Sequence, residues 1–178
     1  LGFGLIGTVL AKIEDKSYPE LLKDRIFSKY QMDHSTADRS TIKEGLVQGL
    51  DPLGRKTSNW DMNSMAGAGA ILSNVEDLSK FALAQFDPAN EALTLTRQKT
   101  FHLFNNLYTG LAWVIIDRTA EAYWYSHNGG TGGYTSSFLI DVENKKGIII
   151  LSNLSAFSPL MINIDQLAYG LMTSTAKE

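Results

Sequence analysis

The spacing of apolar residues divides the chain into a helical part followed by a sheet. Apolar positions recur at helical spacing in residues 1–13 and 78–86, which predicts an amphipathic helix in each segment. We expect the first helix to be buried, with Gly2, Gly4 and Gly7 allowing another backbone to approach closely. After residue 110 the period changes to two, and short links favour antiparallel strands. The predicted strands are Leu111–Asp117, Ala122–His127, Tyr134–Asp141 and Gly147–Asn153.

Residues typical of helix N-termini predict where further helices begin. Ser17–Glu20 reads as a capping box that opens a second helix, and Ser73–Glu76 as a capping box before the 78–86 pattern. Ser158–Pro159 predicts the start of a C-terminal helix whose apolar face packs on the sheet. Residues 90–105 predict a further helix and loop. Residues 30–65 show no regular pattern, and a long irregular excursion of this kind usually covers or rims a site.

Composition excludes several classes of function. The 178 residues suit one domain or part of one, and the net charge of −3 without a basic run argues against nucleic-acid binding. There is no cysteine, and His34, His102 and His127 lie far apart, so we expect no metal site. No apolar run is long enough to span a bilayer. The segment after Leu1 lacks the features of a signal peptide, and without an initiator Met the chain is expected to be a piece of a longer or processed protein.

A glycine cluster follows a histidine near the third predicted strand. Four glycines lie in Gly129–Gly133, just after His127. A phosphate-binding P-loop is excluded, because no Lys-Ser/Thr pair follows and the cluster leads into a strand rather than a helix. Two interpretations stay open, a glycine-rich hairpin with a surface histidine or a strand edge that a ligand approaches closely.

Aromatic residues alternate along the predicted strands. They either line a pocket or, as is more usual for alternating aromatics on strands, pack a core. These residues are Trp60, Trp113, Tyr123, Trp124 and Tyr125.

The stretch Ser126–Tyr134 (SHNGGTGGY) resembles the His-x-Gly form of the third motif of the serine β-lactamase-like family, of the class C β-lactamase and penicillin-binding protein type. The resemblance implies an α+β fold, a helical segment followed by an antiparallel sheet packed by a C-terminal helix, as an incomplete β-lactamase/transpeptidase-like domain. It implies that residues 1–178 are the C-terminal part of a single domain, with 1–105 mostly a helical lobe and 106–178 the strands and last helix. Three further segments resemble the family in the same order: residues 1–27, 66–86 and 138–153.

The same resemblance implies a hydrolase that cleaves amide or ester bonds (a β-lactam, a peptide or an ester) through an acyl-enzyme. It implies no metal or organic cofactor, and a periplasmic or extracellular location. His127 and the backbone of Gly130 are the implied catalytic groups, and Asn128, Gly129 and Thr131 the implied substrate-binding residues. An unperturbed histidine is mostly neutral at pH 7 and holds a carboxylate less firmly than a lysine, which favours an esterase, amidase or peptidase.

The family's nucleophile motif Ser-x-x-Lys and its Tyr-x-Asn motif are expected before Leu1. Two Ser-x-x-Lys strings, Ser40–Lys43 and Ser174–Lys177, occur at chance frequency and in the wrong order for the family. We therefore expect this chain alone to be inactive. The alternative is a non-catalytic truncated homologue that binds a peptide-like ligand or a partner chain. Without N-terminal strands the sheet would have an open edge, which predicts a homodimer or strand exchange.

Overall fold

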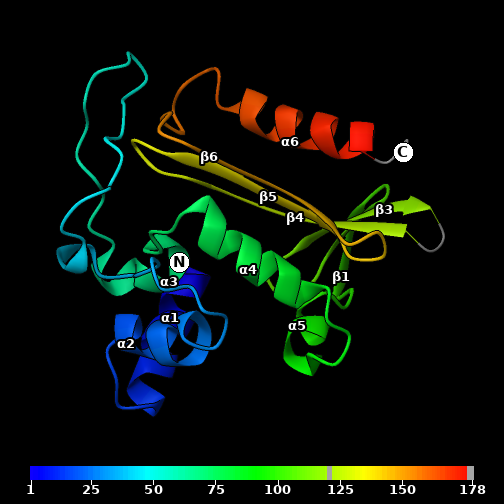
Figure 1. Cartoon of the computed structure of the whole chain (residues 1–178), viewed down its shortest axis with the longest axis horizontal. Coiled ribbons are helices and arrows are strands. Elements are labelled where there is room, and N and C mark those ends of the chain that lie inside the picture. Colours follow the sequence, from blue (N-terminus) through cyan, green and yellow to red (C-terminus); the bar gives the residue numbers. More distant parts are fainter. Residues whose placement is uncertain (120–121, 176–178) are drawn as a thin grey trace.

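The chain folds into a six-stranded antiparallel sheet with helices on both faces (Figure 1). The structure is a computed structural model that describes residues 1–119 and 122–175. Helix α6 (Ile162–Thr175) covers one face, and α4 (Val75–Gln85) lies across the other. Each strand pairs with the next along the chain, as the short links predict. The strands are β1 (Phe101–Phe104), β2 (Leu107–Thr109), β3 (Val114–Thr119), β4 (Ala122–Gly130), β5 (Thr135–Asp141) and β6 (Lys146–Ser152).

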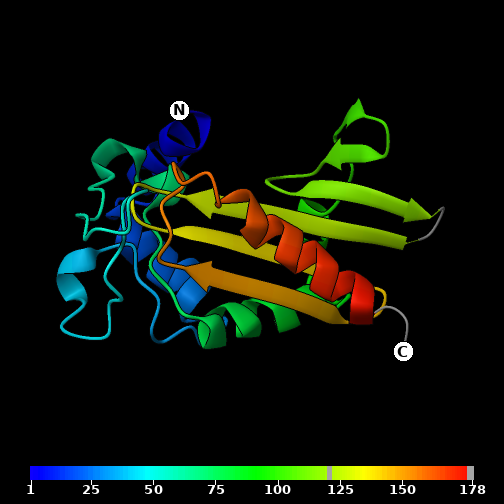
Figure 2. The same ribbon diagram turned by 90° about the horizontal axis from the view of Figure 1, so that it is seen from above.

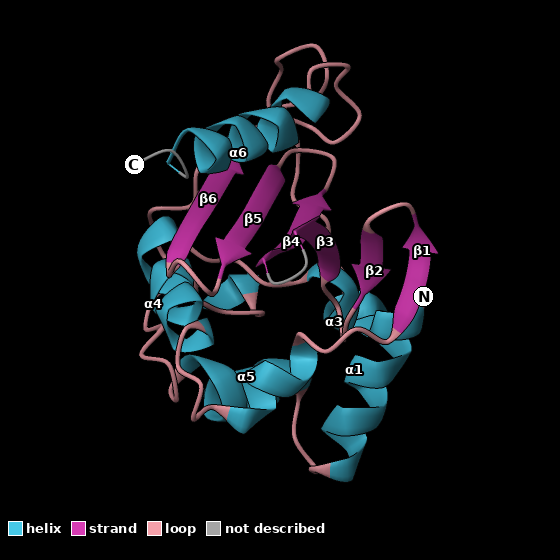
Figure 3. Ribbon diagram, turned by 90° about the vertical axis from the view of Figure 1, so that its right-hand side faces the viewer, coloured by secondary structure: helices cyan, strands magenta, loops and turns pink. Residues whose placement is uncertain are grey.

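This architecture confirms the predicted α+β fold. Figure 2 shows α6 running along β5 and β6, and Figure 3 shows β1 and β2 at the opposite edge of the sheet from β6. The division at residue 105 stays a prediction, and the sheet itself begins earlier, at Phe101. Within the described residues no helix is long and apolar enough to cross a membrane.

The first two strands were not predicted. Residues 90–105 form the expected helix α5 (Glu91–Thr96), but the predicted loop after it is strand β1. All four residues of β1 are exposed, and the strand, Phe-His-Leu-Phe, is too short to establish a period of two. The first predicted strand also begins too early, at Leu111 instead of Val114.

The capping box at Ser17 is confirmed. The Ser17 hydroxyl accepts from the Glu20 amide at 3.4 Å, and the Glu20 carboxylate accepts from the Ser17 amide at 2.9 Å. Helix α2 (Tyr18–Leu22) starts there and continues as a π-helical turn, η1 (Lys23–Phe27). Residues 30–65 are irregular as predicted, apart from the 3₁₀ turns η2 (Arg39–Thr41) and η3 (Asn63–Met65).

The predicted capping box at Ser73 is wrong by one residue. Asn74 caps α4, and its Oδ1 accepts from the Asp77 amide at 2.8 Å. The Ser73 hydroxyl instead lies 2.7 Å from the Ser35 hydroxyl in a neighbouring loop. An asparagine is as good an N-cap as a serine, so adjacent candidates are not resolved by sequence.

The C-terminal helix packs on the sheet as predicted, but it begins at Ile162 rather than at Pro159. The Ser158 hydroxyl accepts from the Leu160 amide at 3.2 Å and closes a turn before the helix. The expected apolar face is also partly wrong. Leu160, Leu167 and Leu171 are exposed, and the buried positions are Ala168 and Met172.

Helix α1 (Gly2–Ile13) is present, but the prediction that it is buried is wrong. The buried residues of α1 are Gly4 and Gly7; Gly7 lies against Gly67 of α3 (Ala66–Gly69), and Gly4 lies against Met65, just before that helix. A Cβ added to Gly7 would lie 2.9 Å from the Gly67 Cα, which confirms the predicted close backbone approach, whereas Gly2 has nothing within 4 Å. Because glycines make the contact, the large apolar side chains point elsewhere and are exposed: Leu1, Phe3, Leu5, Ile6, Val9, Leu10 and Ile13.

The aromatic residues of the sheet mainly build its core. Trp124 belongs to a buried cluster on the α6 face with Leu139 and Met172. Tyr125, the next residue, belongs to a cluster on the α4 face with Trp113. Successive residues of β4 therefore alternate between the two faces. Outside the sheet, Trp60 is 48% exposed.

Candidate active-site strand

The last residues of β4 extend beyond the first residue of its antiparallel neighbour β3. The first residue of β3, Val114, pairs with Ser126, and residues 127–130 pair with β5 only. Among the described strands, none pairs with residues 127–130 on the side where β3 has ended. A free strand edge offers backbone N–H and C=O groups to an extended ligand.

His127 stands at the start of this free edge. It is exposed, and its cross-strand partner is Phe138. The Phe138 ring packs against Phe81 of α4 and against Trp113, with ring centroids 6.4 and 5.8 Å apart. Directly paired residues share a face of the sheet, so the imidazole projects on the α4 face. The motif therefore lies on the surface and not in the hydrophobic interior.

The glycines after His127 sit where a side chain would clash. A Cβ on Gly130 would lie 2.5 Å from the Ala156 Cβ, and a Cβ on Gly129 would lie 2.9 Å from the Ser136 Oγ. Packing alone therefore accounts for glycine at position 130, whereas at position 129 rotation of the Ser136 hydroxyl would relieve the contact. Both residues are nonetheless exposed, so the same small size leaves the edge open to a ligand.

The remaining part of the cluster is a tight hairpin turn. The Thr131 amide donates to the Tyr134 carbonyl at 2.8 Å, and the Thr131 carbonyl accepts from the Ala156 amide at 2.9 Å. A Cβ on Gly132 would lie 2.7 Å from the Trp60 Nε1, so the indole lies directly against the turn. The glycines thus lie in a strand edge and in the hairpin that follows it, and the close approach of a ligand to that edge stays a prediction.

Asn128 faces away from His127. Its Nδ2 donates to the Asp165 Oδ2 of α6 at 2.7 Å. Ser126, on the same face, accepts at its hydroxyl a hydrogen bond from the Tyr169 hydroxyl of α6 at 3.0 Å. The structure brings His127, Gly129, Gly130 and Thr131 to one edge. It places the Asn128 side chain on the α6 face of the sheet. Asp165 and Tyr169 were not predicted, and their only signal in the sequence is their spacing of four residues on one helix.

The irregular segment between α2 and α3 packs on the end of this strand pair. The Leu50 amide donates to the Gly133 carbonyl at 3.3 Å, and the Tyr134 hydroxyl donates to the Val47 carbonyl. A hollow of about 160 Å³ lies there, and its lining includes Arg39 and Tyr134. The segment thus contacts the glycine turn, and its role as the rim of a site stays a prediction.

The two Ser-x-x-Lys strings do not form an activated nucleophile within the described residues. The Ser40 hydroxyl donates to the Asp38 carboxylate at 2.6 Å rather than to Lys43. The Ser174 hydroxyl donates to the Leu171 carbonyl at 2.8 Å, and the lysine of that string, Lys177, lies outside the described residues. Residues 1–119 and 122–175 contain no group of three side chains suited to a metal ion.

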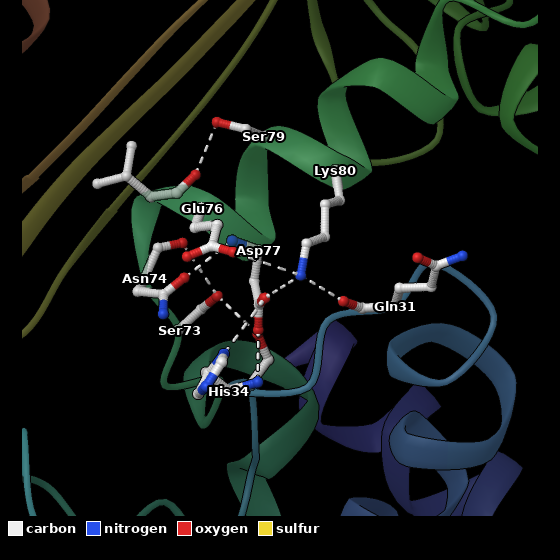
Figure 4. A network of polar contacts seen from close by, with 10 residues as sticks. Gln31, His34, Ser73, Asn74, Glu76, Asp77, Ser79 and Lys80 are labelled. Carbon is white, nitrogen blue, oxygen red and sulfur yellow. Dashed lines mark hydrogen bonds and ion pairs between the residues drawn. The ribbon is translucent and has the colours of Figure 1, made fainter.

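A second polar cluster surrounds Asp77 (Figure 4). Its carboxylate is fully buried and accepts from the His34 amide at 2.7 Å, the Ser35 hydroxyl at 2.8 Å and the Lys80 ammonium at 3.1 Å. Burial alone would raise the pKa of Asp77, but these hydrogen bonds outweigh it and lower the pKa. Lys80 also donates to the Gln31 carbonyl at 2.7 Å. The cluster therefore fastens the loop at residues 31–35 to α4, which is a structural role.

Comparison with known proteins places the fold. A family model described as Beta-lactamase matches residues 1–168. Protein flp of Staphylococcus aureus (strain MW2) is 22% identical over 175 residues, which cover 88% of this chain and 33% of that protein. The chain thus spans about a third of the length of this curated relative.

Solved structures agree with this placement. A class C β-lactamase from Rhodobacter sphaeroides superposes with a TM-score of 0.84 at 16% identity, over 98% of this chain and 59% of the other. An octameric penicillin-binding protein homologue from Pyrococcus abyssi superposes with a TM-score of 0.75 at 23% identity, over 96% and 41%. The match of the family model over most of the sequence shows that the chain belongs to the Beta-lactamase family, within the serine hydrolase superfamily.

Proposed function

We propose that this chain supplies the substrate-facing strand edge of a serine hydrolase that acts on amide or ester bonds, in a β-lactam, a peptide or an ester. The observation that carries the proposal is the free edge at residues 127–130, with an exposed histidine at its start, on a β-lactamase fold. A substrate acyl group lies along this edge in the manner of an added strand.

Each residue of the edge has a proposed role. The Gly130 N–H stabilises the oxyanion that forms when a serine oxygen attacks the carbonyl carbon. His127 assists binding and passes a proton to the departing amine or alcohol as the acyl-enzyme forms. Gly129 and Thr131 form the rim that holds the substrate, and Asn128 contributes its backbone, because its side chain is bonded to α6. Water then cleaves the acyl-enzyme and restores the serine.

The activated serine and its base are proposed to lie outside this chain, because neither Ser-x-x-Lys string is arranged for the task. The chain alone is therefore proposed to be inactive. The chemistry of such a site requires no metal or organic cofactor. We also propose a periplasmic or extracellular location. Copies of the chain are proposed to associate through β6, the last strand of the sheet.

A second candidate function is a non-catalytic homologue that binds a peptide-like ligand or a partner chain. The observation that favours it is the same arrangement of Ser40, whose hydroxyl is bonded to Asp38 and not to a lysine. The two candidates share the binding edge and differ in whether the longer protein that carries this chain turns its ligand over.

A titration followed by NMR tests the shared edge. The ¹⁵N-labelled chain is titrated with a cephalosporin, a short-chain aryl ester and a peptide, and we expect the amide resonances of residues 127–131 to move. His127→Ala should weaken binding by about 3- to 10-fold, the worth of one hydrogen bond. His102→Ala, which removes an exposed histidine from β1, is the matched control and should change nothing.

The outcomes separate the possibilities. Movement of the edge amides, without turnover by this chain, supports the proposal. Turnover by this chain alone would show that its nucleophile is internal, and would overturn the placement of the serine. No response to any of the ligands would overturn the binding edge. Binding without turnover by the longer protein would decide for the non-catalytic homologue.

A further inference from the structure

The residues on either side of His127 are tied to the same helix. The Ser126 hydroxyl accepts from the Tyr169 hydroxyl at 3.0 Å, and the Asn128 Nδ2 donates to the Asp165 Oδ2 at 2.7 Å. Asp165 and Tyr169 are four residues apart in α6 and so lie on one face of that helix. Both bonds reach the strand from the face opposite to the His127 imidazole.

These two bonds occur where the strand has lost other support. Up to Ser126 the backbone of β4 is held by β3 and by β5, whereas from residue 127 onward only β5 pairs with it. Gly129 and Gly130 follow, and glycine leaves the backbone more conformational freedom than any other residue. Side-chain anchors from α6 therefore take over the role of the missing strand.

The Tyr169 anchor is built into the core. Its ring stacks on Trp124 at a centroid distance of 6.4 Å and an interplanar angle of 26°. Its partner Ser126 is only 6% exposed. Removing the Tyr169 hydroxyl would leave the buried Ser126 hydroxyl without this donor, while the ring would still fill its place.

We propose that Tyr169 and Asp165 are positioning residues, which hold His127 at the free edge by fixing its two neighbours from behind the sheet. Neither residue touches the substrate. The inference rests on the proposed function, since it assigns a role to the fixed orientation of His127. Loosening either bond lets the strand twist at residue 127, so the imidazole no longer faces a ligand on the edge although it is chemically intact.

Three variants of the full chain test this inference. Tyr169→Phe removes only the hydroxyl, and Asp165→Ala removes the acceptor of Asn128. Asp165→Asn removes the charge but keeps an oxygen that accepts from the Asn128 amide, so it separates the hydrogen bond from the electrostatic effect of the carboxylate. Gln166→Ala, at the adjacent exposed position of α6, is the matched control.

The primary measurement is the position and width of the His127 ring resonances and of the amide resonances of residues 127–130. We expect Tyr169→Phe and Asp165→Ala to shift and broaden them and to weaken ligand binding by about 3- to 10-fold. Asp165→Asn and Gln166→Ala should both give the native spectrum. Unchanged resonances for residues in β1 and β2 show that each variant is folded.

Ring resonances that stay at their native positions in both Tyr169→Phe and Asp165→Ala would overturn the inference. So would an Asp165→Asn spectrum that matches Asp165→Ala, because the hydrogen bond would then not be the cause. If the native chain binds no ligand, the proposed function fails, but the ring resonances still decide whether α6 positions His127.

Discussion

The contact between α1 and α3 gives a prediction whose sign is set by backbone geometry. A Cβ added to Gly67 would lie 2.3 Å from the Phe3 carbonyl oxygen and 3.0 Å from the Gly7 Cα. Both are backbone atoms, so no side-chain rotation can relieve the contact. In Gly67→Ala, α1 must therefore move away from α3.

The magnitude follows from two opposing effects. Restoring an ordinary contact of 3.4 Å to the Phe3 oxygen requires a shift on the order of 1 Å, and overpacking of this kind typically costs roughly 1–3 kcal/mol. Alanine is a better helix former than glycine by up to about 1 kcal/mol. Overpacking is the larger effect, so we expect Gly67→Ala to lower the free energy of unfolding by about 1–2 kcal/mol.

Urea unfolding followed by circular dichroism measures this change. The matched control is Gly170→Ala, in the middle of α6, where an added Cβ meets nothing within 4 Å. That variant should be more stable than the native chain by up to about 1 kcal/mol. If Gly67→Ala proved as stable as the native chain while Gly170→Ala gained stability, the close approach of the two backbones would be refuted.

Two further predictions concern the buried carboxylate and the last strand. Because the folded pKa of Asp77 is lowered from 3.8, its stabilisation is complete above that pH and is lost as pH falls through the lower folded value. Asp77→Asn should cost about 1–3 kcal/mol at neutral pH and flatten the acid limb of stability against pH; equal acid limbs in both proteins would contradict this. Light scattering should detect dimers that form through the edge of β6. Leu151→Lys, at a position 39% exposed, should reduce the fraction of dimer. A native chain that stays monomeric at high concentration would count against association.

Much of the sheet could be predicted because its strands bury side chains on both faces. Trp124 and Tyr125 pack on opposite faces, and burial on both faces leaves a short apolar run between turn residues, which indicates a strand in the sequence. Strand β1 has four residues, all exposed, and is too short to stand out from a loop in this way. For α1 the pattern was present but misleading, because an apolar sequence indicates burial, and here Gly4 and Gly7 make the contact instead.

The histidine and glycines of the candidate site could be found from sequence because they form one continuous motif. Their support could not be found in the same way. Asp165 is 37 residues from Asn128 and Tyr169 is 43 residues from Ser126, and each reads as an ordinary polar position on a surface helix. Only the register of α6 over β4 shows which of its side chains reach Ser126 and Asn128.

The exposure of the edge itself depends on where β3 begins. In the observed register Val114 pairs with Ser126 and Ile115 with Tyr125, so a strand that began at Leu111, as the sequence predicted, would continue the ladder to Gly129 and cover most of the edge. The backbone prevents this, because Ala112 has a φ of +71° in the left-handed region, which is incompatible with an extended strand. The site is therefore open because of a turn in a neighbouring segment, and not because of any residue of the motif.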